Sequence, residues 1–173
     1  WLGKEPEIKD ISETVESDVI VIGAGTGGAY AAASCLEKKL KVVILEKNAM
    51  VATLRNDWGS IGSKWQLEEK AKLDAATILH YHQMYSANRI DSRLPKIWLK
   101  ESGAAIDWIG ELLISRGARF YYEGGYEPDF TPTTYPKFPT GHSGDFDEGV
   151  TGASIMQRYI EELGGRYYFE TPF

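Results

Sequence analysis

A glycine-rich turn between two apolar segments constrains the fold of this chain more than any other feature. The turn reads Gly23-x-Gly25-x-x-Gly28 and directly follows the apolar run 18–22. A helix-prone, alanine-rich segment, 29–39, comes next and leads to a second apolar run, 41–46. Continuous apolar runs are typical of parallel strands covered on both faces. The pattern therefore predicts a β-α-β unit with a right-handed crossover, and an α/β fold built on a parallel sheet.

The spacing of the three glycines suits a turn that binds the diphosphate of a dinucleotide. The first permits a tight turn, the second lets the backbone approach the pyrophosphate, and the third lets helix and strand pack closely. The helix then presents free N–H groups and the positive end of its dipole. Glu46 ends the second strand, where a carboxylate accepts hydrogen bonds from a ribose diol and repels a 2′-phosphate. These features favour FAD or NAD over NADP, and they do not decide between the first two.

Two stretches carry a family resemblance. Residues 18–32 read DVIVIGAGTGGAYAA and residues 41–47 read KVVILEK. Together they resemble the N-terminal signature of FAD-dependent oxidoreductases, in particular the flavoprotein subunit family of fumarate reductase and succinate dehydrogenase. The resemblance implies a Rossmann-like FAD-binding domain with FAD as the cofactor.

Further segments resemble the same family less specifically. Residues 55–63 stand where the family has a small-residue loop along the FAD, and 152–171 resemble the helix and strand that precede its cap-bearing half. Ala52 and Thr53 replace the family's usual Gly-Gly. The expected cofactor-binding residues are Gly23, Ala24, Gly25, Thr26, Gly27, Gly28, Glu46, Lys47, Gly59, Ser60 and Gly62.

The resemblance also implies an activity. Family members transfer a hydride between reduced flavin and an activated carbon–carbon double bond, so the expected substrate is an unsaturated acid or an enone-like molecule. They are far longer than this chain, and their cap domain and catalytic Arg and His residues lie beyond the region covered here. We therefore expect an FAD-binding domain that stops before the cap, assign no catalytic residue, and expect the 173 residues alone to retain FAD poorly and to be inactive. The electron donor stays open.

Two other functions remain open at this stage. One is an NAD-dependent dehydrogenase domain, because the glycine pattern is shared. The other is a non-catalytic nucleotide-binding module whose missing half is supplied by further chain or by a partner.

Composition excludes several classes of protein. The formal net charge of −6 argues against nucleic-acid binding, which depends on cations placed over phosphates. A single cysteine, Cys35, excludes an internal disulfide, and we expect it to be a small buried residue on the first helix. His80 and His82 point to different faces of a predicted helix, so no metal site is expected. No apolar run approaches the roughly 20 residues of a membrane span. We expect a soluble protein, cytoplasmic or exported.

The remaining chain is divided as follows. We interpret residues 1–16 as a lead-in segment and 17–173 as the N-terminal part of an FAD-binding domain. The elements expected within it are a loop at 47–64, a long helix at 65–88, a helix from near Pro95 to Gly117, an aromatic and proline-rich excursion at 118–150, a helix at 152–163 and a strand at 166–171.

Two side chains have alternative interpretations. His142, in a glycine-rich stretch, either faces a substrate cavity or is a solvated loop residue. Trp58 lies in the proposed cofactor loop, and it packs either in the core, like the other tryptophans, or near the flavin.

Overall fold

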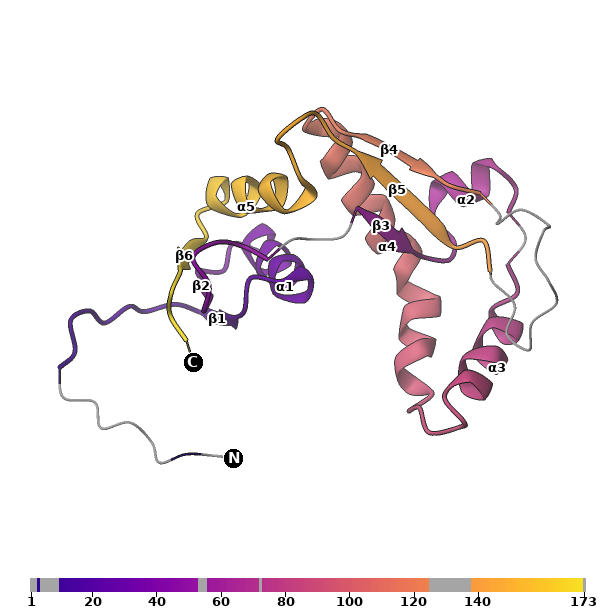
Figure 1. The fold of residues 1–173 in the computed structure, drawn as a ribbon, viewed down its shortest axis with the longest axis horizontal. Coiled ribbons are helices and arrows are strands. Elements are labelled where there is room, and N and C mark those ends of the chain that lie inside the picture. The colour runs from indigo at the N-terminus through magenta and orange to yellow at the C-terminus, as the bar shows by residue number, and fades with distance from the viewer. Residues whose placement is uncertain (1–2, 4–9, 53–55, 72, 125–137, 173) are drawn as a thin grey trace. The chain divides into compact units, whose positions relative to one another are not determined.

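The computed structural model describes residues 3, 10–52, 56–71, 73–124 and 138–172 (Figure 1). The chain divides into two compact units. Unit 1 comprises Trp1–Ala52 and Gln157–Phe173, and unit 2 comprises Thr53–Met156. Helix α5 (Gly152–Glu162) begins in unit 2 and ends in unit 1.

Unit 1 contains the predicted β-α-β unit. Strand β1 (Val19–Ile22), helix α1 (Thr26–Glu37) and strand β2 (Val42–Leu45) follow one another, and β6 (Arg166–Tyr168) completes the sheet. All pairings are parallel, in the order β1-β2-β6. The core lies beneath α1, where the small residues Ala32 and Ala33 are fully buried. This arrangement confirms the α/β class and the parallel sheet.

One face of β1 is open, contrary to the expectation that both faces are covered. Val21 is buried, whereas Ile20 and Ile22 are 59% and 58% exposed. Successive side chains of a strand point to opposite faces of its sheet, so these two isoleucines share the uncovered face. On β2 the consecutive residues Val42, Val43 and Ile44 are all buried, so both faces of that strand are covered within the described residues.

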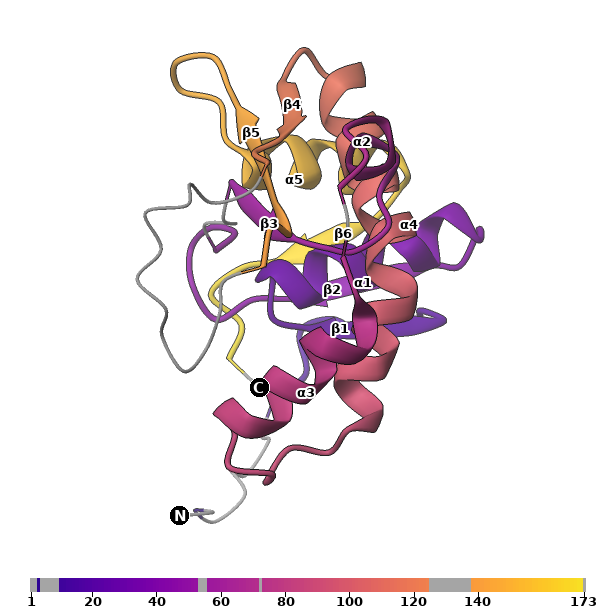
Figure 2. The ribbon, with the colours of Figure 1, turned by 90° about the vertical axis from the view of Figure 1, so that its right-hand side faces the viewer.

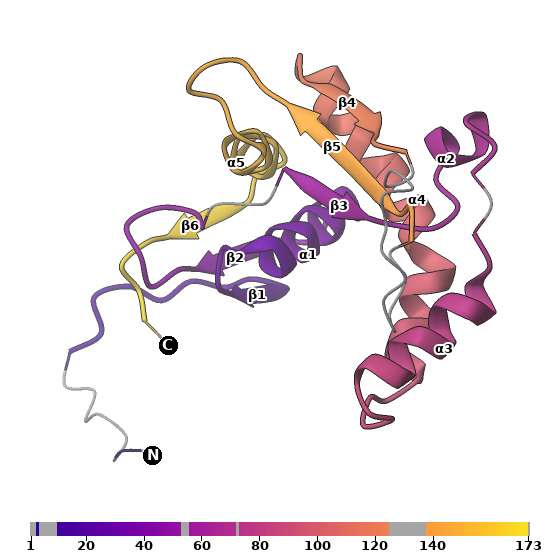
Figure 3. The same ribbon diagram turned by 45° about the vertical axis from the view of Figure 1, so that its right-hand side comes forward.

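Unit 2 is built around a long helix and a small antiparallel sheet. Strands β3 (Asp57–Gly59), β4 (Arg119–Tyr122) and β5 (Gly141–Asp145) pair in the order β3-β5-β4. Figure 3 shows this sheet beside helix α4 (Arg93–Ser115). Helix α2 (Lys64–Glu68) is a short turn of helix, and α3 (Ala75–Tyr85) lies along the N-terminal half of α4 (Figure 2).

The sequence accounts for both ends of α4. Pro95 lies in its first turn, as predicted, and the Asp91 carboxylate accepts the Arg93 amide at 3.0 Å. At the other end Gly117 has φ +87°, the Gly117 amide donates to Ile114 O, and the Ala118 amide donates to Leu113 O. This is a Schellman cap, which requires a left-handed residue and so favours glycine.

The prediction of one continuous helix over 65–88 is wrong. The structure has α2 and α3 instead, separated by a break in which Lys70 has φ +55°. Asp74 caps α3 by accepting the Thr77 amide at 2.9 Å. A capping aspartate starts a new helix, and that local signal outweighed the apolar periodicity.

The structure differs from the predicted secondary structure in three further segments. The loop 47–64 contains β3, and the two ends of the 118–150 excursion form β4 and β5. Residues 125–137 of that excursion lie outside the described residues. The predicted strand 166–171 ends at Tyr168, after which Glu170 has φ +51°.

No helix of the described residues combines the length and the apolar character that crossing a membrane requires.

The third glycine of the turn offers a test of this packing. A Cβ at Gly28 would lie 1.9 Å from the carbonyl oxygen of Gly23, whereas a Cβ at Gly27 would meet nothing within 4 Å. We expect Gly28→Ala to lower the free energy of unfolding by about 2–3 kcal/mol. Gly27→Ala, the matched control, should be neutral or stabilising by about 1 kcal/mol. Urea denaturation of the cofactor-free protein measures both, and equal stabilities would contradict the close approach.

Candidate cofactor-binding site

The turn after β1 has the geometry that a dinucleotide requires. Gly23 has φ +92°, a conformation that favours glycine, and its amide donates to Leu45 O at 2.7 Å. Gly28 touches the Gly23 carbonyl, so α1 starts directly against the strand. The first and third glycines thus have the roles predicted from their spacing.

The N-terminus of α1 is open. Its N-cap is Gly25, and no side chain caps the helix within the described residues. Thr26 and Gly27 are exposed, and a Cβ at Gly25 or Gly27 would meet nothing within 4 Å. Among the described residues no side chain accepts from the first-turn amides, and the positive end of the helix dipole lies behind them. This open end fits a diphosphate.

Glu46 ties the end of β2 to this turn. One of its carboxylate oxygens accepts the Ala24 amide at 2.7 Å and the other accepts the Asn48 amide at 2.8 Å. These two backbone hydrogen bonds lower the pKa of Glu46 below its usual value, and the side chain is only 4% exposed. The carboxylate is therefore ionised at neutral pH, and each oxygen keeps lone-pair capacity for a hydroxyl donor.

The surrounding backbone fixes Glu46 from two sides. The Glu46 amide donates to Tyr168 O, and the Thr171 amide donates to Glu46 O at 2.9 Å. Ala52, at the departure from the family's Gly-Gly, donates its amide to Ala24 O at 3.3 Å. The Ala24 and Ala52 amides are thus engaged within the protein, whereas Lys47 is exposed.

The second predicted segment, Gly59–Lys64, belongs to unit 2. Each of its last five amides donates to an acceptor within unit 2. The pairs are Ser60 to Thr140 O, Ile61 to Ser102 Oγ, Gly62 and Ser63 to Gln66 Oε1, and Lys64 to Asp107 Oδ1. The segment therefore offers no row of free amides comparable to the start of α1. Its open point is Gly62, which is exposed, has φ +81° and would have nothing within 4 Å of a Cβ.

Three buried polar side chains support that segment from behind. Ser63 begins α2 in a capping box with Gln66, and the Gln66 Nε2 donates to Ser60 O at 2.8 Å. Ser63 Oγ lies 2.7 Å from His142 Nε2, and His142 Nδ1 lies 3.0 Å from Thr140 O. Because a carbonyl only accepts, Nδ1 carries the proton and Nε2 accepts from the serine hydroxyl.

Both interpretations of His142 are wrong. The residue lies on β5 with 0% exposure, stacked on Phe120 with ring centroids 6.0 Å apart. Burial lowers the pKa of His142 below its usual value, against an upward contribution from its hydrogen bond to Thr140. A buried neutral imidazole replaces the solvated or substrate-facing side chain that the glycine-rich context suggested.

Two other predicted side chains are placed by the structure. Trp58 lies on β3 and packs on Phe120, with ring centroids 5.5 Å apart, as a core tryptophan does. Cys35 lies on α1 as a free thiol and is half-buried, not fully buried as expected. Among the residues that contact the Gly59–Lys64 segment and were missed are three on α4: Ser102, Gly103 and Asp107. Gly103, a glycine inside a helical pattern, was the available signal.

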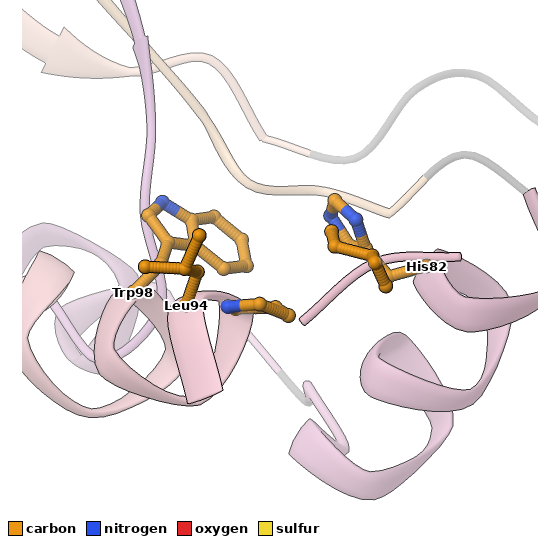
Figure 4. Close-up of a pocket in the computed structure, with 5 residues that line it drawn as sticks. His82, Leu94 and Trp98 are labelled. Atoms are coloured by element: carbon orange, nitrogen blue, oxygen red, sulfur yellow. The ribbon is translucent and has the colours of Figure 1, made fainter. Parts of the chain in front are cut away.

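A cavity of about 300 Å³ lies between α3 and α4. Its walls are His82, Ile90, Leu94, Pro95 and Trp98, and Figure 4 shows the rings of His82 and Trp98 on opposite sides. Four apolar side chains and one imidazole suit an uncharged group and not a carboxylate. We therefore do not assign this cavity to an unsaturated acid.

The fold and the open helix terminus define a dinucleotide-binding α/β protein. The model of the FAD binding domain family matches residues 18–172, and the chain belongs to that family. This match decides between the two cofactors left open, in favour of FAD.

The chain is similar to several known proteins. The fumarate reductase (cytochrome) of Shewanella frigidimarina strain NCIMB 400 is 29% identical over 126 residues, covering 63% of this chain and 21% of the relative. The chain thus spans about a fifth of the length of that relative. The 3-ketosteroid-Δ4-(5α)-dehydrogenase of Rhodococcus jostii RHA1 superposes with a TM-score of 0.65, at 18% identity, over 89% of this chain and 38% of the neighbour. The open conformation of a flavocytochrome c3 fumarate reductase superposes with a TM-score of 0.61 at 16% identity. The match covers 89% of this chain and 26% of that structure.

The buried histidine predicts a specific dependence on pH. The pKa of His142 is lowered in the folded state, so unfolded chains take up a proton first as the pH falls through about 6.5. Stability is therefore fully present above that pH and falls below it, by up to about 1.4 kcal/mol per pH unit. Denaturation at pH 7.5 and 5.5 measures this loss. In His142→Phe the loss should shrink, and His80→Phe, at an exposed histidine, is the control variant.

NMR of the wild-type protein tests the same point if the His142→Phe variant does not fold. The His142 ring resonance in the wild type should not titrate through pH 6.5. A normal titration there would contradict the burial.

The Glu46 carboxylate predicts the affinity for the adenosine half of the cofactor. Glu46→Gln leaves one acceptor oxygen for two amides, so the glycine turn loses one anchor and the ribose loses a charged acceptor. We expect the dissociation constant for ADP to rise about tenfold or more, measured by calorimetry. Glu16→Gln, at an exposed glutamate, is the control. Unchanged ADP affinity in Glu46→Gln would refute the assigned role.

Proposed function

We propose that this chain is the FAD-binding part of a flavin-dependent oxidoreductase that reduces an activated carbon–carbon double bond. The open N-terminus of α1, with the ionised Glu46 beside it, is the observation that carries the cofactor assignment. Bound FAD supplies hydride transfer chemistry. The likeness to fumarate reductases supports the double bond as the reacting group. Because the chain spans about a fifth of those relatives, activity and substrate are proposals for the whole protein.

The residues of unit 1 would hold the adenosine diphosphate half. The segment Gly23–Gly28 provides first-turn amides for the phosphates, with the Thr26 hydroxyl exposed beside them. Glu46 accepts from the ribose diol through the lone pairs that Ala24 and Asn48 leave free. Lys47, exposed after the strand, adds positive charge near the same end of the sheet.

Gly59, Ser60 and Gly62 would serve the ribityl or flavin end. Since the amides of Ser60 and Gly62 are used within unit 2, the contact has to come from the exposed backbone edge at Gly62. A glycine without a Cβ lets a flat ring approach the backbone closely. Ser60 Oγ is buried without a hydrogen-bond partner in the described residues.

The proposed substrate is an unsaturated acid or an enone-like molecule, and its catalytic groups are assigned to no residue of this chain. The Rhodococcus neighbour, a ketosteroid dehydrogenase, supports the enone class through its fold alone. The Shewanella relatives support the acid class. A non-catalytic nucleotide-binding role is an outcome of the test below.

Cofactor loading tests the proposal. The complete purified protein should show flavin absorption bands near about 370 and 450 nm. It should bind FAD far more tightly than NAD, and FAD should raise its melting temperature. The reduced protein should then be reoxidised by fumarate or by an enone under anaerobic conditions. FAD binding without reoxidation by either compound would favour the non-catalytic module, and absence of FAD binding would overturn the cofactor assignment.

A further inference from the structure

Helix α4 contacts the Gly59–Lys64 segment residue by residue. Four positions within ten residues of the helix take part. The pairs are Trp98 with Gly59, Ser102 with Ile61, Gly103 with Gly62, and Asp107 with Lys64. The residue numbers rise together in both partners, so the segment runs in the same direction as the helix. Helix α4 therefore supports the segment together with Thr140 and Gln66, which accept its other amides.

Ser102 makes a hydrogen bond that few side chains could replace. Its Oγ accepts the Ile61 amide at 3.0 Å, across 41 residues of sequence, and the residue is buried. Without it, the Ile61 amide would lose its acceptor in a part-buried place, which costs free energy. Ser102 therefore sets which way this peptide unit faces.

Gly103 sets how closely the helix approaches. A Cβ at this position would lie 2.6 Å from the carbonyl carbon and oxygen of Gly62 and from the oxygen of Ile61. All three are backbone atoms, so relief would require the segment itself to move. In an otherwise regular helix, glycine costs about 1 kcal/mol relative to alanine. The close backbone contact is what this glycine allows.

The two ends of the segment are held as well. Trp98 Nε1 donates to Gly59 O at 3.1 Å, and the Lys64 amide donates to Asp107 Oδ1 at 2.8 Å. Between them, the Gly62 amide donates to Gln66 Oε1 at 2.7 Å. With its amides turned inward, the segment leaves the Gly62 backbone edge as its open point.

We propose that Ser102 and Gly103 are positioning residues for the isoalloxazine end of FAD. They fix the Gly59–Lys64 segment so that the Gly62 edge meets the flat ring, although neither residue touches the cofactor. This proposal rests on the proposed function, since it requires the segment to contact the flavin. It assigns α4 a task that the glycine turn of unit 1 does not perform.

Comparison of FAD with ADP tests this assignment, because ADP lacks the ribityl and isoalloxazine groups. In the complete protein, Ser102→Ala should weaken FAD binding about fivefold to tenfold and leave ADP binding within twofold. Gly103→Ala should weaken FAD binding more strongly. Ser102→Thr, which keeps the hydroxyl, should retain FAD affinity within about threefold. Ser115→Ala is the matched control, since Ser115 lies on the same helix and its exposed hydroxyl donates to Leu112 O.

Amide hydrogen exchange of the cofactor-free protein gives a reading that a general loss of stability would not mimic. Peptides covering Ile61 and Gly62 should exchange faster in Ser102→Ala, while peptides covering α3 should not change. The absorption spectrum of bound flavin should shift in Gly103→Ala.

The outcomes separate the two proposals. If the wild type binds FAD more tightly than ADP but the variants lose both ligands equally, or lose neither, the positioning role is overturned and the proposed function stands. If the wild type binds FAD no more tightly than ADP, the segment does not meet the flavin and the positioning role is overturned, whereas only the absence of FAD binding overturns the proposed function.

Discussion

The hydrogen bond from the Ala24 amide to the Glu46 carboxylate holds the candidate site together. It joins the turn after β1 to the end of β2 across 22 residues. Parallel strands bring those two points to the same edge of the sheet, so a short acidic side chain can span them. The same bond keeps the carboxylate charged, which a ribose diol requires. Geometry and ionisation at this edge thus have a common cause.

Unit 2 holds the segment proposed for the flavin end of the cofactor in a different way. Its Gly59–Lys64 segment is held by side chains, mainly from α4, and not by a helix terminus. The buried polar group of Ser63, Gln66 and His142 is almost fully hydrogen-bonded. Such satisfied networks favour one arrangement over its alternatives, since each broken bond leaves an unpaired buried group. The segment is therefore preorganised by its own unit.

Much of unit 1 could be predicted from sequence, because its signals are local and strong. Gly23, Gly25 and Gly28 occupy three distinct positions of one turn, and Val42–Leu45 is a continuous apolar strand. Unit 2 was harder for physical reasons. Strand β5 reads GHSGD and contains no β-branched or large aromatic residue. It is a strand because it pairs with β3 and β4 on both sides, and sequence alone does not reveal such long-range pairing. The contacts of Ser102 and Asp107 were missed for the same reason.

The order of segments along the chain bears on how the protein is synthesised. Strand β6 pairs with β2, its partner more than one hundred residues earlier, and all of unit 2 lies between them. A nascent chain leaving the ribosome therefore completes the β3-β5-β4 sheet before the strand that finishes the β1-β2-β6 sheet exists. Pairings so distant in sequence form slowly, because the intervening loop has to be closed first. Until β6 has been synthesised, one edge of β2 has no pairing strand. An unpaired strand edge promotes aggregation, so chaperone binding is most useful during this interval.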